Sequence, residues 1–192
     1  FPLAYETYGS LNENKDNAIL VFHALTGDQF VTGINPITKK DGWWSNAVGP
    51  NKSIDTNKYF VICANVIGGC MGSFGPSHKN PDTNKIYGTD FPVITINDMV
   101  NAQVNLLDHF EIKKLFSVVG GSMGGMQVLQ FISNYPDKAS TVVPIACTSN
   151  HSAQNIAFNE LGRQAIASDH NWSDGKYLSN NTLPDKGLSV AR

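Results

Sequence analysis

The chain has 192 residues, of which 41% are hydrophobic and 16% charged, a composition ordinary for a globular domain that buries a core. The 14 Lys and Arg residues against 16 Asp and Glu give a formal net charge of −2, and the basic residues are scattered. This pattern argues against nucleic acid and anionic membranes as partners. The 3 cysteines form no Cys-x-x-Cys pair, which argues against a disulfide framework or a zinc site and fits a reducing compartment.

No apolar stretch of the sequence approaches the ~18 residues of a membrane span, and the first residues lack the basic and apolar regions of a signal peptide. We therefore expect a cytoplasmic protein. The chain begins without methionine and stops abruptly after Arg192. We expect both ends to continue in a longer protein.

Four short apolar runs predict strands of a parallel sheet that are buried on both faces. They span residues 18–22, 59–64, 116–119 and 141–146. The segment 94–110 carries apolar residues at spacings of four, four and three, namely Ile96, Val100, Val104 and Leu107, which predicts an amphipathic helix.

A second helix is predicted over 126–135, because its apolar residues recur every three positions and Pro136 follows it. Strands that alternate with helices predict an α/β fold with a mostly parallel sheet. After Ala146 the sequence becomes polar, with helical patterning over 153–168. We interpret residues 1–147 as part of an α/β core and residues 148–192 as the beginning of a helical insertion over the site.

Residues 116–127 read Phe-Ser-Val-Val-Gly-Gly-Ser-Met-Gly-Gly-Met-Gln, so that a strand leads through Gly-x-Ser-x-Gly into a helix. This setting is the one that a nucleophile elbow requires, and it makes Ser122 the candidate nucleophile. Gly120 and Gly124 flank the turn, where a side chain would collide with the strand or the helix. A glycine-rich turn with an incidental serine is the alternative interpretation.

An acyl-transfer serine needs two backbone N–H groups that hold the oxyanion. The residue after the nucleophile supplies one, which indicates Met123. The other comes from a loop after an earlier strand, and His23-Ala-Leu-Thr-Gly-Asp28 follows the run 18–22 at the edge where open α/β sheets bind ligands. Leu25 is the candidate for the second donor.

The sequence leaves the catalytic base open. His23 ends a strand, where a histidine more often fixes a loop by hydrogen bonding. In the expected triad order the acid and the histidine follow the serine. His151 and His170 are downstream of Ser122, but both lie in the polar segment rather than after a core strand. We therefore expect the catalytic Asp and His beyond Arg192.

Long blocks rich in Trp, Gly and Cys are spread over nearly the whole chain: His23-Ala-Leu-Thr-Gly-Asp, Asp41-Gly-Trp-Trp, Tyr59-Phe-Val-Ile-Cys-Ala-Asn, Gly68-Gly-Cys-Met-Gly-Ser, Tyr87-Gly-Thr-Asp-Phe-Pro, Gly120-Gly-Ser-Met-Gly-Gly-Met-Gln and Gly162-Arg-Gln-Ala-Ile. Together these blocks resemble the homoserine O-acetyltransferase family of acyltransferases. The resemblance implies an α/β-hydrolase fold with a helical lid.

What the resemblance implies about activity is ping-pong transfer. Ser122 would take an acetyl group from acetyl-CoA, and the side-chain hydroxyl of L-homoserine would then attack the acyl-enzyme. The product, O-acetyl-L-homoserine, would feed methionine biosynthesis. Acetyl-CoA is a co-substrate in this scheme, and no bound cofactor and no metal are expected.

The same resemblance assigns Arg163, in the inserted helix, to the carboxylate of the amino acid. A guanidinium suits this role because it can hold a carboxylate through two parallel hydrogen bonds. A solvent-exposed arginine on a lid helix is the alternative. A homodimer formed through the lid is a further expectation.

Other residues of these blocks have structural alternatives. Trp43 and Trp44 could floor a substrate channel, but adjacent aromatic residues more often anchor a loop on the core. The glycines of 68–72 could let substrate approach the backbone, or could form a tight turn. Cys70 has no neighbouring base that would make it a nucleophile. Phe74 stands where threonine is common in the family, which leaves the acyl and alcohol preference open.

Three classes of function remain. The first is the acyltransferase, with homoserine O-succinyltransferase and serine O-acetyltransferase as variants. The second is a serine esterase or thioesterase that uses water as acceptor, and a lid that shields the acyl-enzyme favours the transferase over it. The third is a non-catalytic α/β module. The fold alone does not decide between them.

Overall fold

The computed structural model describes residues 1–192, and its backbone contacts divide the chain into two compact units. The first unit comprises Phe1–Phe74 and Ile94–Thr148, and the second comprises Gly75–Val93 and Ser149–Arg192. The sequence predicts a boundary after residue 147. The structure differs in that residues 75–93 group with the C-terminal helices rather than with the sheet.

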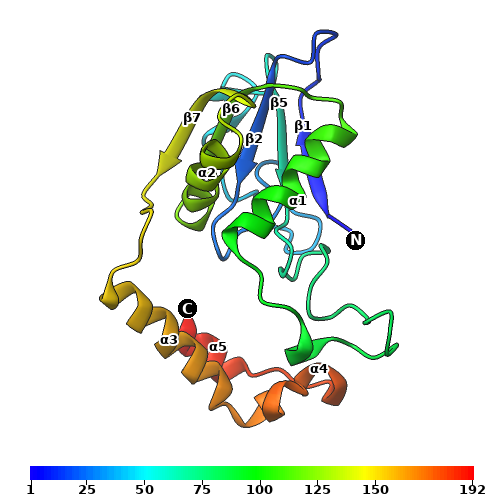
Figure 1. The fold of residues 1–192 in the computed structure, drawn as a ribbon, viewed down its shortest axis with the longest axis vertical. Helices are drawn as coiled ribbons and strands as arrows, with labels where there is room; N and C mark the ends of the chain where they lie inside the picture. Colours follow the sequence, from blue (N-terminus) through cyan, green and yellow to red (C-terminus); the bar gives the residue numbers. More distant parts are fainter. The chain divides into compact units, whose positions relative to one another are not determined.

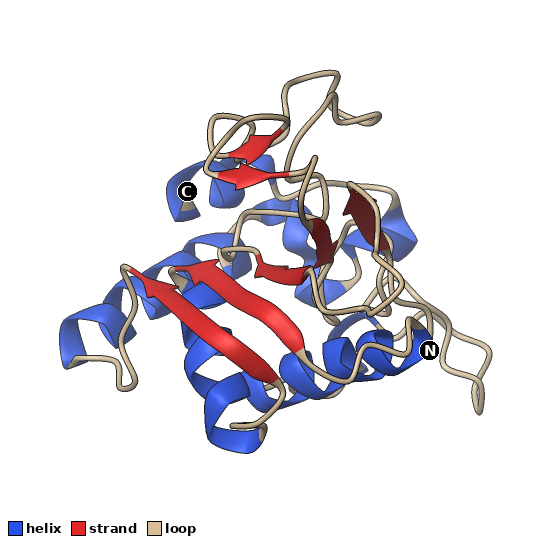
Figure 2. Ribbon diagram, turned by 90° about the horizontal axis from the view of Figure 1, so that it is seen from above, coloured by secondary structure: helices blue, strands red, loops and turns tan.

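The first unit is built around a five-stranded sheet in the order β1-β5-β2-β6-β7 (Figure 1). The strands are β1 (Tyr5–Tyr8), β2 (Ala18–Phe22), β5 (Phe60–Ala64), β6 (Leu115–Gly121) and β7 (Ala139–Ile145). Only the β1–β5 pair is antiparallel. Figure 2 shows β6 and β7, the longest strands, side by side. Two short strands, β3 (Val48–Gly49) and β4 (Ile54–Asp55), form a separate parallel pair.

Two helices, α1 (Ile96–His109) and α2 (Met123–Asn134), cover one face of this sheet (Figure 1). Helix α1 begins at a capping box, in which the Thr95 hydroxyl accepts from the Asp98 amide and the Asp98 carboxylate accepts from the Thr95 amide. Such a box satisfies two otherwise unpaired N–H groups. The core on this face lies between the two helices and strands β2, β5 and β6. Its side chains include Leu20, Phe22, Ile62, Val104, Leu107, Val128 and Phe131.

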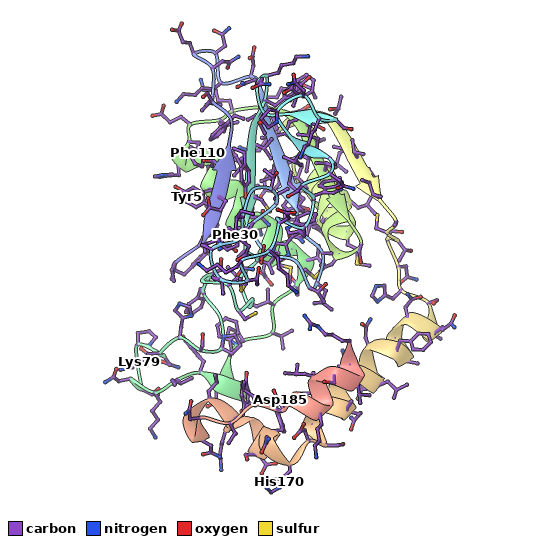
Figure 3. All side chains as sticks on the ribbon, turned by 180° about the vertical axis from the view of Figure 1, so that it is seen from behind. Tyr5, Phe30, Lys79, Phe110, His170 and Asp185 are labelled. Atoms are coloured by element: carbon purple, nitrogen blue, oxygen red, sulfur yellow. The ribbon has the colours of Figure 1, made fainter.

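The opposite face of the sheet is covered by the segment between β2 and β5. Alternate residues of the central strands, including Ile19, Val21, Val61 and Cys63, pack there against Val31, Val48, Trp44 and Ile54. At the edge of the sheet, the rings of Tyr5 and Phe110 meet edge to face with centroids 5.6 Å apart (Figure 3). Since both faces are covered, β2 and β5 are buried throughout, as the continuous apolar runs predict, whereas β6 exposes Phe116 near its start.

Each of the four predicted strands and three predicted helices is present, with ends shifted by a few residues, and the predicted α/β class is confirmed. One prediction is wrong: β7 is not buried on both faces, because most of its residues are exposed. It lies at the end of the sheet order and has β6 as its single neighbour. Strand β1 has no counterpart among the predicted strands, because its sequence Tyr-Glu-Thr-Tyr contains no apolar run.

The second unit is helical. It contains η1 (Gly88–Asp90), α3 (Ala153–Ala167), η2 (His170–Gly175), α4 (Tyr177–Asn180) and α5 (Asp185–Ala191). A Cβ on Gly187 would lie 2.5 Å from the Ala165 carbonyl oxygen, so the backbones of α3 and α5 approach more closely than a side chain there would allow. Backbone hydrogen bonds from Gly187 and Asn171 to the Asp169 carboxylate lower its pKa and tie α5 to the end of α3. No helix in either unit has the length and apolar character that a membrane span requires.

Candidate active site

Ser122 occupies a strained turn between the last residue of β6 and the first residue of α2. Its backbone angles are φ 56° and ψ −122°, a region that costs a non-glycine residue about 1–3 kcal/mol. Backbone hydrogen bonds hold the turn, since the Ser122 amide donates to the Ile145 carbonyl at 3.0 Å and the Ser122 carbonyl accepts from the Met126 amide at 3.1 Å. The serine is exposed at the carboxyl end of a parallel strand, where open α/β sheets bind ligands.

The glycines on either side of Ser122 allow this turn to sit against β2. A Cβ on Gly124 would lie 2.1 Å from the Phe22 carbonyl oxygen, and one on Gly120 would lie 2.4 Å from the Gly124 carbonyl oxygen. Real Cβ contacts are never this short, and the obstructing atoms are backbone. In contrast, a Cβ on Gly121 would meet nothing within 4 Å. The first and last glycines of Gly-x-Ser-x-Gly are therefore required by close packing, as the sequence predicts.

We expect Gly124→Ala to lower the free energy of unfolding by about 1–3 kcal/mol, because the added methyl group forces α2 away from β2. Gly121→Ala is the matched control, and we expect its free energy of unfolding to stay close to that of the wild type. Urea unfolding followed by circular dichroism measures both. Equal stabilities of the two variants would contradict the packing argument.

The two candidate oxyanion donors lie at the carboxyl ends of neighbouring strands. Met123 is the first residue of α2, so its amide is among the N–H groups that lack an acceptor within the helix. Leu25 lies in the loop that follows β2 and is 72% exposed. Phe22 pairs with Gly120 in the sheet, and this register places the start of that loop beside the turn at Ser122. The oxyanion roles of both amides stay predictions.

His23 is buried at the end of β2, and both of its ring nitrogens are engaged. Nε2 accepts a hydrogen bond from the Val66 amide at 3.1 Å and lies 3.4 Å from the side-chain nitrogen of Asn65. Nδ1 lies 2.7 Å from the Ala24 carbonyl oxygen. Since Nε2 accepts, Nδ1 carries the proton and donates a hydrogen bond to the Ala24 carbonyl oxygen. A ring held in this way has no free lone pair for a serine, which argues against His23 as the catalytic base.

The bond from His23 to Ala24 also orients the candidate donor on Leu25. The Ala24 carbonyl and the Leu25 N–H belong to one peptide group, which is planar and trans. Fixing the direction of the carbonyl oxygen therefore fixes the opposite direction of the N–H. His23 acts in this geometry as a residue that positions the loop.

Burial is the main cause that lowers the pKa of His23, although its bond to Ala24 and the charge of Asp28 oppose the shift. The unfolded chain binds a proton at His23 below about pH 6.5, whereas the folded protein resists it. The free energy of unfolding should therefore fall as pH drops below about 6.5 toward the lowered pKa, by at most about 1.4 kcal/mol per pH unit. Urea midpoints between about pH 7.5 and 5.5 measure this effect, and His23→Gln, which cannot titrate, should show a smaller drop. An equal drop in both proteins would contradict it.

The loop after β5 is fixed by Asn65 and Ser73. The Asn65 side-chain oxygen accepts from the Met71 amide at 3.1 Å, and the buried Ser73 hydroxyl donates to the Asn65 carbonyl and accepts from the Ala4 amide. Gly69 donates to the Val66 carbonyl at 3.0 Å, which makes residues 66–69 a tight turn. The turn interpretation of the glycines of 68–72 thus has direct support.

Trp43 and Trp44 stack on each other, with ring centroids 5.4 Å apart. The Trp43 indole N–H donates to the Asp28 carbonyl at 2.9 Å, and Trp44 packs against the buried side chains on its face of the sheet. These contacts are those of a loop anchor. Asp28 in turn uses its carboxylate within the same loop, where it accepts from the Phe30 amide and from the Asn35 side chain.

Arg163 lies on α3 in the second unit, and its guanidinium is paired within its own helix. Its Nε and Nη2 lie 2.8 Å and 2.7 Å from one carboxylate oxygen of Glu160, three residues earlier. The Arg163 side chain is 64% exposed. It borders a largely apolar hollow of about 450 Å³ within that unit, which Trp172, Tyr177, Leu183, Pro184 and Leu188 help to line. A substrate carboxylate would therefore compete with Glu160 for this arginine.

The remaining candidates are dispersed. His170 is exposed at the start of η2, and His151 is half-buried just before α3. Cys70 is exposed with a free thiol. No group of three or more His, Cys, Asp and Glu side chains is arranged to hold a metal ion.

The sequence patterns do not identify Asn65 and Val66 as partners of His23, because these residues are 42 and 43 positions away along the chain. One signal could have found them. In a parallel sheet the residues that follow neighbouring strands meet at one edge, and β2 and β5 are neighbours.

Comparison with known proteins identifies relatives over the entire chain. The chain is 77% identical to a homoserine O-acetyltransferase of Pelagibacter ubique (strain HTCC1062) over 192 residues, which is 52% of that protein. It is 62% identical to the homoserine O-acetyltransferase of Nitrobacter hamburgensis over 48% of that protein. The chain thus spans about half the length of the curated relatives it matches.

Solved structures give the same picture of the fold. The crystal structure of homoserine O-acetyltransferase from Bacillus anthracis superposes with a TM-score of 0.91 at 32% identity, covering 98% of this chain and 52% of that one. Esterase E22 superposes with a TM-score of 0.89 at 35% identity, covering 98% of this chain and 53% of that one. The family model described as alpha/beta hydrolase fold matches residues 17–189. The chain belongs to the alpha/beta hydrolase fold family.

Proposed function

We propose that the full-length protein transfers an acetyl group from acetyl-CoA to the side-chain hydroxyl of L-homoserine. The observation that carries this proposal is 77% identity over the whole chain to a protein named homoserine O-acetyltransferase. The elbow adds chemical support, because a strained and exposed serine at the start of a helix suits covalent acyl transfer. The product would enter methionine biosynthesis.

The reaction proceeds in two half-reactions in this proposal. The Ser122 hydroxyl oxygen attacks the thioester carbonyl of acetyl-CoA, and the amides of Leu25 and Met123 hold the oxyanion that forms. Collapse of the tetrahedral intermediate breaks the carbon–sulfur bond and releases CoA, with the serine proton passing to the sulfur through the base. The homoserine hydroxyl then attacks the acetyl-serine, and its proton returns to Ser122. The acid and base of the triad belong to the part of the protein beyond Arg192.

The second unit supplies the remaining parts of the proposal. Arg163 binds the homoserine carboxylate, and the helices of this unit form the beginning of a lid. The lid also forms a homodimer, for which the exposed apolar side chains of Phe158 and Leu161, three residues apart on one face of α3, provide a surface. The free thiols of the chain suit the reducing cytoplasm as the place of reaction.

The test uses full-length protein with acetyl-CoA, in the presence and absence of L-homoserine, and follows free CoA with a thiol reagent. Release of CoA that depends on homoserine and yields O-acetyl-L-homoserine is the expected result. L-serine as acceptor and succinyl-CoA as donor, each substituted in turn, should support much slower release. A preference for either substitute would replace the proposed substrate pair.

Ester hydrolysis is the second candidate, because esterase E22 is 35% identical to this chain and superposes with a TM-score of 0.89. A hydrolase would let water attack the acyl-enzyme. The same assay separates the two activities, since a hydrolase releases CoA and acetate at an undiminished rate without homoserine.

A further inference from the structure

A pair of buried glutamines links the two helices that pack on the sheet to the candidate active site. Gln103 on α1 and Gln127 on α2 are each 0% exposed. The side-chain nitrogen of Gln103 donates to the side-chain oxygen of Gln127 at 3.0 Å. The side-chain nitrogen of Gln127 lies 3.5 Å from both the His23 and the Met123 carbonyl oxygens. Both distances are at the long limit for hydrogen bonds, and the NH2 group has one N–H for each acceptor.

Stability does not explain this pair. The side-chain oxygen of Gln103 is buried and has no hydrogen-bond partner, which is unfavourable. Replacing both members of a buried polar pair by apolar groups of similar shape is often neutral or stabilising. The surroundings are apolar, since Val100, Val104, Val128 and Phe131 are buried on the same two helices. An apolar pair would therefore suit this position at least as well for folding.

What distinguishes Gln127 is the backbone that it touches. Met123 begins α2 and carries one candidate oxyanion donor on its amide; the carbonyl that Gln127 touches belongs to the next peptide group, one turn before Gln127 on the same helix. The His23 carbonyl belongs to the peptide group that precedes Ala24, and the next peptide group carries the Leu25 N–H. The His23 ring already holds the second of these peptide groups through the Ala24 carbonyl. Gln127 holds the first, so side chains fix two consecutive peptide planes that lead to Leu25.

We propose that Gln127, oriented by Gln103, is a positioning residue that fixes the amides of Leu25 and Met123 relative to each other before substrate binds. The inference rests on the proposed function for the oxyanion that these amides would hold. Donors aimed in advance at a developing charge need no reorganisation during the reaction. Loss of the link should therefore slow acylation of Ser122 without weakening the binding of acetyl-CoA.

The experiment compares Gln127→Met with Gln130→Met in the full-length protein. Gln130 lies on the same helix and hydrogen-bonds the Asn134 side chain at 2.9 Å on an exposed part of the surface, which makes it a matched control. We expect Gln127→Met to slow the acylation burst with acetyl-CoA by about 10- to 50-fold, less than the ~10²–10³-fold loss on removing an oxyanion donor. The acetyl-CoA concentration that gives half the maximal burst rate should change by less than about 2-fold, as for an interaction made only in the transition state. Gln130→Met should match the wild type in both quantities.

A double variant, Gln103→Met with Gln127→Met, separates positioning from folding. We expect it to unfold at a temperature no lower than the wild type, yet to retain the slow burst. A wild-type burst rate in Gln127→Met, or a loss that follows the fraction of unfolded protein, would overturn the inference. The proposed function fails separately. If the wild-type protein gives no acyl-enzyme with acetyl-CoA or with p-nitrophenyl acetate, no oxyanion site exists and both proposals fall. A normal burst in both the wild type and Gln127→Met removes the role of Gln127 alone.

Discussion

Replacing Ser122 by alanine should abolish acetyl transfer by the full-length protein and leave its fold intact. The loss should be of order 10⁴-fold or more if the serine carries covalent catalysis. Folding should be unaffected, because alanine at φ 56° is no more strained than serine and the change removes one exposed oxygen. The steady-state rate of CoA release and the thermal unfolding midpoint measure the two effects.

Ser133→Ala is the matched control for this experiment, since Ser133 is an exposed serine on the same helix. It should transfer acetyl groups at the wild-type rate. A Ser122→Ala protein that retains wild-type rates would remove the elbow from the mechanism. A Ser122→Ala protein with a much lower unfolding midpoint than the wild type would contradict the expectation that the substitution leaves the fold intact.

The second large effect is expected for Arg163→Lys. A guanidinium that grips a carboxylate with two hydrogen bonds becomes a single ammonium, and a charge-assisted hydrogen bond is worth about 1.5–3 kcal/mol. This range corresponds to about a 10- to 150-fold loss in kcat/KM for homoserine. The acylation of Ser122 by acetyl-CoA should be nearly unchanged, because only the second half-reaction contains the carboxylate. A stopped-flow burst measures acylation, and a steady-state titration with homoserine measures the second step.

Glu160→Gln tests the same interaction from the other side, because it removes the charge that competes with a substrate carboxylate for Arg163. It removes the charge that pairs with Arg163 in this structure, so the KM for homoserine should stay the same or fall. If Arg163→Lys slows both half-reactions equally, the arginine supports the fold of the second unit. If it slows neither, the carboxylate is bound elsewhere.

The strands and helices that position the elbow could be predicted because their signals are local. Continuous apolar runs predict β2, β5 and β6, and apolar residues at spacings of three and four predict α1. The Gly-x-Ser-x-Gly turn could be predicted for a similar reason. Its glycines indicate places where backbones approach closely, and in the structure Gly124 lies against the Phe22 carbonyl.

Features that depend on distant parts of the chain could not be predicted in this way. Apolar composition makes β7 look like a central strand, but burial depends on what covers the strand, and a run of letters does not contain that information. The pairing of Arg163 with Glu160 could be predicted from their spacing of three residues on one helix. The spacing does not indicate whether a substrate replaces Glu160.

The sequence contains a signal for the buried glutamines, because both fall on apolar helix faces. Gln103 is three positions after Val100 and thus falls on the apolar side of α1, and Gln127 is four positions before Phe131 on the buried side of α2. A polar residue on an apolar helix face calls for a partner. Periodicity indicates that such a residue is unusual, whereas the identity of its partner emerges only when the two helices are packed.

The most direct test of the central claim is the covalent state of Ser122 after full-length protein is mixed with acetyl-CoA alone. Intact-protein mass spectrometry followed by peptide mapping should find one acetyl group, located on Ser122, and L-homoserine should remove it. An unmodified protein that nevertheless releases CoA when homoserine is present, or an acetyl group that persists in Ser122→Ala, would contradict transfer through this serine.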